Sequence, residues 1–158
     1  MNNIIIGSIQ KFISIVDNEI QLINNIPIGN KPIKIISFIG NARTGKSTLM
    51  NCYISNKVNE NIKKFNTANR CTTGIDMLLV ETLTCNLILL DVQGLELQDS
   101  RDDCKLMLFV YLISNMIIFC PKTILDNTVL SSLQSLTTIL TFVDNIENNT
   151  IVNLYIIG

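Results

Sequence analysis

The stretch FIGNARTGKSTLMN, residues 38–51, begins apolar and then changes to glycine, arginine, lysine and hydroxyl side chains. It contains the pattern G-x-x-x-x-G-K-[ST] at Gly40, Gly45, Lys46 and Ser47. The apolar, β-branched run IKIISFIG before it is typical of a strand buried on both faces, and KSTLMNCYI after it opens a helix. Because a phosphate-binding loop requires a strand before it and a helix after it, the context strengthens the match.

Each part of this pattern has a physical role in binding a nucleoside triphosphate. Glycines let the backbone approach phosphate closely, and the loop N–H groups and the helix N-terminus present positive dipole ends. Lys46 is expected to reach the β- and γ-phosphates, and Ser47 to ligate Mg²⁺. A chance glycine-rich turn would match four fixed positions about once in a hundred chains of this length. The residues expected to contact nucleotide are Gly40, Asn41, Ala42, Arg43, Thr44, Gly45, Lys46, Ser47, Thr48, Asp91 and Gly94.

The composition of the chain limits its class. A length of 158 residues, with 47% hydrophobic and 16% charged residues, fits one globular domain over residues 1–158. A net charge of -1 offers no global field for nucleic acid or anionic membrane. Five cysteines without CxxC spacing and no histidine exclude most zinc and histidine-based sites and favour reducing, cytoplasmic surroundings. No secretory signal is seen, and the apolar run 106–120 is shorter than the about 20 residues that span a bilayer.

The order of the remaining elements predicts an α/β fold. Residues 9–24 read as a hairpin, and MLLVET and NLILLD as two strands that pair antiparallel. A helix, the strand NMIIFCP, a long helix and the strand NLYIIG follow, while 55–70 is predicted as a loop. We expect a three-layer P-loop NTPase fold with a mostly parallel sheet, helices on both faces and an N-terminal hairpin.

A second carboxylate is expected near the loop. The run LILLDVQG ends an apolar strand on Asp91, with Gly94 three residues later. In a P-loop protein Asp91 would hold Mg²⁺ and the Gly94 N–H would contact the γ-phosphate. The alternative reading of Asp91 is a helix N-cap.

The segment RCTTGID, residues 70–76, lies between these motifs. Thr72 or Thr73 could supply a hydroxyl that closes over Mg²⁺ when the triphosphate is bound. Without the flanking motifs, the two threonines would simply begin a strand.

In this order, the three motifs resemble the G domain of guanylate-binding proteins and atlastins, large GTPases of the dynamin superfamily. GNARTGKSTLMN is similar to that family's P-loop, CTTGID to its switch I segment and LILLDVQGLE to its strand ending in aspartate-x-glutamate-glycine-leucine. The resemblance covers essentially the whole chain.

The resemblance implies Mg²⁺-dependent GTP hydrolysis to GDP, with Arg43 as an internal arginine finger that acts on dimerisation of the G domain. Leu95 stands where a Ras-like enzyme has its water-orienting glutamine, so charge stabilisation must come from elsewhere, and Arg43 is the nearest candidate in sequence. A solvated loop arginine remains the alternative reading of Arg43. The implied catalytic residues are Arg43, Lys46, Thr72 and Gln93, and the implied Mg²⁺ ligands are Ser47, Thr72 and Asp91.

Two departures from the family pattern leave other functions open. Gln93 stands where the family has glutamate, which alters the expected hydrogen bonds around the attacking water. The family's guanine-reading residues would follow NLYIIG, so we read the chain as an incomplete G domain in which the base preference cannot be assigned. An ATP-using P-loop protein and a non-enzymatic nucleotide-binding or interaction module are therefore alternatives.

Overall fold

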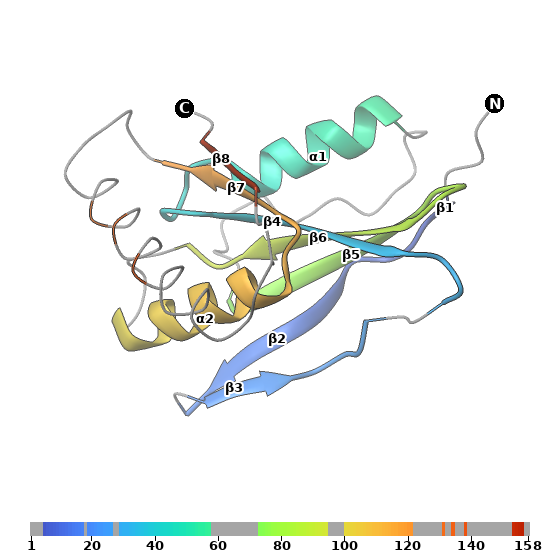
Figure 1. Ribbon diagram of the computed structural model, residues 1–158. Helices are drawn as coiled ribbons and strands as arrows, with labels where there is room; N and C mark the ends of the chain where they lie inside the picture. Colours follow the sequence, from blue (N-terminus) through green and yellow to red (C-terminus); the bar gives the residue numbers. More distant parts are fainter. Residues whose placement is uncertain are drawn as a thin grey trace.

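The computed structural model describes residues 5–17, 19–26, 29–57, 73–94, 100–121, 131, 134, 138 and 153–156. Within them, one β-sheet lies between helix α1 on one face and helix α2 on the other (Figure 1). The elements are β1 (Ile5–Ile6), β2 (Gln10–Val16), β3 (Glu19–Leu22), β4 (Ile33–Gly40), α1 (Lys46–Lys57), β5 (Ile75–Glu81), β6 (Asn86–Val92), α2 (Ser100–Ile113), β7 (Met116–Cys120) and β8 (Asn153–Ile156).

The sheet has two halves of different type. Its strand order is β3-β2-β5-β6-β4-β7-β8, and β1 pairs with β5. Strands β6, β4, β7 and β8 are parallel neighbours, whereas β3, β2, β5 and β6 pair antiparallel. The α/β class, the three layers and the N-terminal hairpin are confirmed, but the expected mostly parallel sheet is corrected to a mixed one. The connection between β5 and β6 is too short for the crossover that a parallel pair requires.

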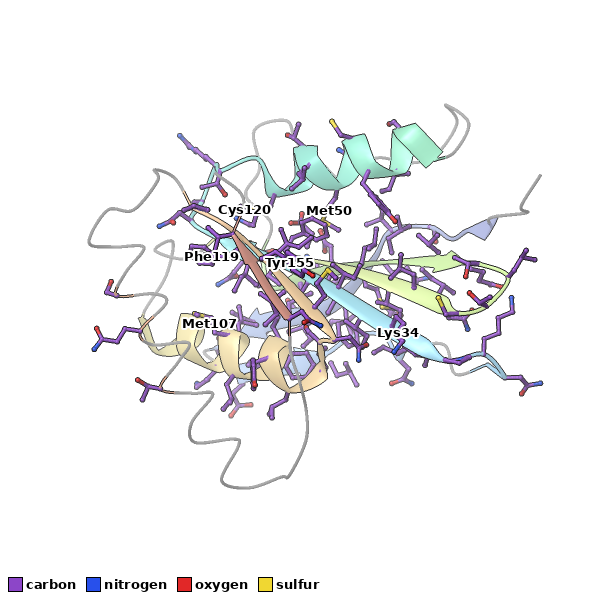
Figure 2. All side chains as sticks on the ribbon, turned by 45° about the horizontal axis from the view of Figure 1, so that its top comes forward. Lys34, Met50, Met107, Phe119, Cys120 and Tyr155 are labelled. Atoms are coloured by element: carbon purple, nitrogen blue, oxygen red, sulfur yellow. The ribbon has the colours of Figure 1, made fainter. Side chains whose placement is uncertain are left out.

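The two faces of the sheet bury separate apolar clusters. On the α1 side, Met50 and Ile54 pack on side chains from the central strands. On the α2 side lies the larger cluster, to which the helix contributes a stripe of four residues. Figure 2 shows Met50 and Met107 on these opposite sides. The stripe consists of Leu106, Met107, Val110 and Tyr111, a spacing that keeps one helix face against the sheet.

The apolar run 106–120 is divided between α2 and β7, as expected. Ser114 ends the helix: its backbone N–H donates to the Val110 carbonyl at 3.0 Å, and its hydroxyl lies 2.6 Å from that of Ser37 in β4. Among the described residues, no helix is long and apolar enough to cross a bilayer.

The other expected elements are confirmed where the structure describes them. Strands β4 to β8 and the antiparallel pairing of β5 with β6 lie where the sequence places them. Most of the predicted helix at 125–146 lies outside the described residues, although residues 131, 134 and 138 are helical. The predicted loop at 55–70 begins later than expected, since α1 continues to Lys57, and 58–70 lies outside the described residues.

Candidate phosphate-binding site

The loop between β4 and α1 has an unusual backbone. Gly40, Arg43 and Gly45 have positive φ angles of 138°, 61° and 85°. A side chain on Gly40 would also lie 2.1 Å from the Cys120 carbonyl oxygen, so this position requires glycine for conformation and for space. Arg43 adopts the left-handed region without being glycine, at a cost of about 1–2 kcal/mol. Such strain is often stored at functional sites.

Helix α1 begins directly at the end of this loop. The first helical hydrogen bond runs from the Leu49 N–H to the Gly45 carbonyl at 2.8 Å, and Thr44 closes the loop by donating to the Asn41 carbonyl at 3.0 Å. The first turn of α1 contains no acidic residue. No acidic side chain of this turn therefore competes with an anion at the loop for the positive end of the helix dipole.

Lys46 lies under the loop with its side chain buried. Only 6% of the residue is exposed, and its ammonium donates to the carbonyls of Gly40 at 3.1 Å and Asn41 at 2.7 Å. Because a buried ammonium is costly unless it is hydrogen-bonded, these carbonyls hold the charge in place at the loop. The structure thus places a fixed positive charge where the sequence predicted a phosphate contact.

Ser47 and Asp91, far apart in sequence, meet at the start of α1. The Ser47 hydroxyl donates to Asp91 Oδ2 at 2.5 Å, and Asp91 is 1% exposed. The parallel pairing of β4 with β6 places Phe38 opposite Asp91, so the two strands end at the same edge of the sheet. Hydroxyl and carboxylate oxygens are ligands that Mg²⁺ accepts, usually together with substrate phosphate oxygens. These two residues therefore fit a Mg²⁺ ion.

Gly94 lies against the loop from the β6 side. A Cβ atom built on Gly94 would be 2.4 Å from the Ala42 Cα, so the two backbones are in direct contact. Only glycine permits this approach. The glycine of the D-x-x-G pattern is thus at the loop, and its contact with the γ-phosphate stays a prediction.

The described end of the threonine segment is bound to Gln93. The Gly74 N–H donates to Gln93 Oε1 at 2.8 Å, and the Gln93 N–H donates to the Gly74 carbonyl at 2.8 Å. Gly74 has φ 73°, and a side chain there would lie 2.2 Å from the Ile13 carbonyl oxygen. Thr73 is exposed, and Thr72 lies outside the described residues.

The remaining predicted residues differ in position. Arg43 and Thr48 are exposed, Asn41 is buried, and Ala42 and Thr44 are half-buried in the loop. The structure brings together the loop, Lys46, Ser47, Asp91 and Gly94, whereas the Gln93 side chain is engaged with the Gly74 backbone. Their roles with nucleotide stay predictions.

Cys120 borders this site and was missed by the sequence reasoning. It ends β7 and pairs with Gly40 in the parallel register. Burial raises the pKa of the Cys120 thiol, the Lys46 charge opposes this rise and the Asp91 charge adds to it. A search for residues at the carboxyl ends of neighbouring parallel strands could have found it.

A buried strand, a glycine loop with its lysine, a helix and a serine bonded to a distant aspartate define a P-loop nucleotide-binding protein. The family model for the guanylate-binding protein N-terminal domain matches residues 14–153, nearly the whole chain. The chain therefore belongs to the guanylate-binding protein family, and the resemblance inferred from its motifs is confirmed.

The other comparisons add little. No curated protein matches the chain in sequence. A crystal structure of bacterial selenocysteine-specific elongation factor EF-Sec is similar with a TM-score of 0.42 and 12% identity. The match covers 79% of this chain and 26% of that one, so this chain spans about a quarter of the length of EF-Sec.

Proposed function

We propose that the chain binds GTP together with Mg²⁺ and hydrolyses it to GDP and phosphate. The observation that best supports this is the 2.5 Å hydrogen bond between Ser47 and Asp91 at the start of α1. It joins the last residue of the phosphate loop to the carboxylate of the neighbouring strand, which is the pair of groups a P-loop protein uses for Mg²⁺. Membership of the guanylate-binding protein family favours guanine over adenine.

Binding of the triphosphate would use groups already in place at the loop. The N–H groups of residues 41–47 and the N-terminus of α1 would surround the β-phosphate. Lys46 would exchange the carbonyls of Gly40 and Asn41 for phosphate oxygens, which gains the attraction of opposite charges. No large movement of Lys46 is needed, since its ammonium already lies at the loop.

Ser47 and Asp91 would hold Mg²⁺, with Thr72 as the third predicted ligand. The ion supplies positive charge that neutralises the phosphate oxygens as charge develops on them. Ser47 would give up its hydrogen bond to Asp91, and both oxygens would turn to the metal site.

Hydrolysis requires charge stabilisation beyond Lys46. Water would attack the γ-phosphorus, the bond to the bridging oxygen would break, and GDP would leave. Arg43 is the proposed source of this charge: it lies on the loop, it is exposed, and its backbone has a positive φ angle of 61°. We further propose that a second copy of the chain covers this face and directs Arg43 towards phosphate.

A titration with GTP, GDP and ATP, each with Mg²⁺ and with EDTA, tests the function, and phosphate release tests turnover. We expect guanine nucleotides to bind more tightly than ATP, GTP binding to weaken in EDTA, and phosphate to be released from GTP. Tighter binding of ATP would assign the site to an adenine nucleotide. Binding without turnover in a folded protein would identify a non-enzymatic module, and absence of binding would overturn the proposal.

A further inference from the structure

Gln93 is one of the most completely buried polar residues that the structure describes, and only one of the two polar atoms of its amide group has a hydrogen-bond partner. It is 2% exposed, its Oε1 accepts from the Gly74 N–H at 2.8 Å, and within the described structure its Nε2 has no hydrogen-bond partner. A buried donor without a hydrogen-bond partner carries a desolvation cost. An apolar side chain of similar size would avoid this cost. The hydrogen bond at Oε1 is therefore what a glutamine adds at this position.

The two bonds between Gly74 and Gln93 extend the pairing of β5 and β6. The last regular pair of this ladder is Ile75 with Val92. Beyond it, the Gln93 N–H donates to the Gly74 carbonyl, as in a regular hydrogen-bonded pair. In a regular pair the Gly74 N–H would donate to the Gln93 carbonyl, and here the Gln93 side-chain oxygen takes the place of that carbonyl. The chain therefore enters the sheet at Gly74 through a bond that depends on one side chain.

The same turn is held from β2 on its other side. The Lys11 ammonium donates to the Thr73 carbonyl at 2.7 Å and forms an ion pair with Asp76. Gly74 packs so closely on the Ile13 carbonyl that no side chain fits between them. The entry point of the threonine segment is thus fixed between β2 and the end of β6.

Gln93 also lies on the side of the sheet that carries the phosphate site. Leu89 packs in the α1-side cluster and Asp91 bonds to Ser47 of α1. Gln93 follows at the same two-residue spacing, which keeps side chains on one face. Its neighbour Gly94 contacts Ala42 of the loop. Two adjacent residues, Gln93 and Gly94, therefore connect the threonine segment to the phosphate loop.

We propose that Gln93 is a positioning residue that holds Gly74 and thereby presents the neighbouring Thr73 to the terminal phosphate and its metal. This role rests on the proposed function. It assigns to Gln93 a structural bond to the threonine segment, and no contact with the attacking water. Because GDP lacks the terminal phosphate, the bond matters for GTP and has no effect on GDP.

Three variants test this role. Gln93→Glu keeps an acceptor for the Gly74 N–H, Gln93→Met removes it, and Asn86→Leu is the matched control. Asn86 is a buried amide at the opposite end of the same strand, and its Oδ1 also lacks a hydrogen-bond partner among the described residues. Loss of a buried amide in general would affect Asn86→Leu and Gln93→Met alike.

The first measurement is hydrogen exchange at the Gly74 amide in nucleotide-free protein, read by NMR against the Leu89 amide. The second is affinity for a non-hydrolysable GTP analogue and for GDP. In Gln93→Met we expect about tenfold faster exchange at Gly74 and about tenfold weaker binding of the analogue, equal to about 1.4 kcal/mol, with GDP affinity unchanged. Gln93→Glu should keep the slow exchange at Gly74, and Asn86→Leu should behave as the natural protein in both measurements.

Several results would overturn the role. The role is overturned if exchange at Gly74 is unchanged in Gln93→Met, if affinity for the analogue and for GDP falls equally, or if Asn86→Leu shows the same losses. Each of these results would leave GTP binding by the natural protein intact. A natural protein that binds neither nucleotide would overturn the proposed function, and this role with it. The two failures are therefore distinguishable by the natural protein alone.

Discussion

The two halves of the sheet bring different parts of the chain to the same edge. In the parallel half, β6, β4 and β7 all end there, so Gln93, the phosphate loop and Cys120 follow one another along it in this order. In the antiparallel half, β5 runs the other way and begins there, because Ile75 pairs with Val92. The segment ending at Gly74 therefore arrives at the site from the opposite direction.

This difference explains why a mixed sheet suits the proposed reaction. A fully parallel sheet gathers only the carboxyl ends of strands at its active edge. Here the antiparallel strand β5 adds the amino end of a strand, and with it the threonine segment. The groups proposed to bind phosphate and those expected to close over it thus come from different halves, and substitutions should affect them separately.

The largest effect is expected at the phosphate loop. Lys46→Ala should abolish detectable GTP and GDP binding, because it removes the buried ammonium that lies on the loop carbonyls. Isothermal calorimetry measures this loss. Lys34→Ala is the matched control, since Lys34 is an exposed lysine near the start of β4, at the end of that strand far from the loop (Figure 2). A comparable loss in the control would show that the effect is not local.

The next effect is a slower rate of GTP hydrolysis without a large change in GTP affinity. Arg43→Ala should slow GTP hydrolysis by a factor on the order of 10³ while GTP affinity stays within about threefold. Single-turnover phosphate release measures the rate. Arg43→Gly should lose the same rate and also relieve the backbone strain at φ 61°, which raises stability by about 1 kcal/mol. Hydrolysis at the natural rate in both variants would contradict the finger role.

Glycine substitutions compare the two halves directly. Gly40→Ala in the parallel half and Gly74→Ala in the antiparallel half each place a Cβ within 2.2 Å of a carbonyl oxygen at a positive φ angle. Both should lower the free energy of unfolding by on the order of 3 kcal/mol. Gly45→Ala should lose only about 1 kcal/mol, because no heavy atom lies within 4 Å of its Cβ position.

Urea unfolding measures these three losses. Equal losses at the three positions would mean that backbone conformation alone, and not the close carbonyl contact, determines the cost at Gly40 and Gly74.

The smallest effect is a pH dependence from Cys120. Burial raises its pKa above the usual 9.0, so the folded protein favours the neutral thiol. The unfolded chain releases the thiol proton first as pH rises; the stabilisation is therefore complete below about pH 9 and decreases above it. Urea midpoints at pH 7 and pH 10 should differ more in the natural protein than in Cys120→Ala. An identical difference in both would contradict a buried, neutral thiol.

Most of the fold and the centre of the site could be predicted because their signals are local. The β-branched run before Gly40, the glycine-lysine-serine pattern and the aspartate ending an apolar strand each depend on residues adjacent in sequence. Topology then brings Asp91 to Ser47, because strands β4 and β6 are parallel neighbours.

The features that were missed depend on contacts across the sheet. The balance of parallel and antiparallel strands follows from which strands pair, and nothing in one strand specifies its partner. The bond between Gln93 and Gly74 joins residues in two strands, and Cys120 reaches the loop only through the register of β7 on β4. Sequence patterns describe each partner of such a contact separately and do not specify that the two residues come into contact.

At the far end of the sheet, Asn115 fixes the alignment on which the site depends. Its Oδ1 accepts from the Ile35 N–H at 2.9 Å, its N–H donates to the Ile35 carbonyl at 3.0 Å, and its own carbonyl accepts from Asn153 at 3.4 Å. A slip of one residue between β4 and β7 would displace one strand along the other by about 3.3 Å and exchange its two faces. A single amide at the opposite end of β7 from the phosphate loop thus helps to set the position of the loop relative to the ends of the neighbouring strands.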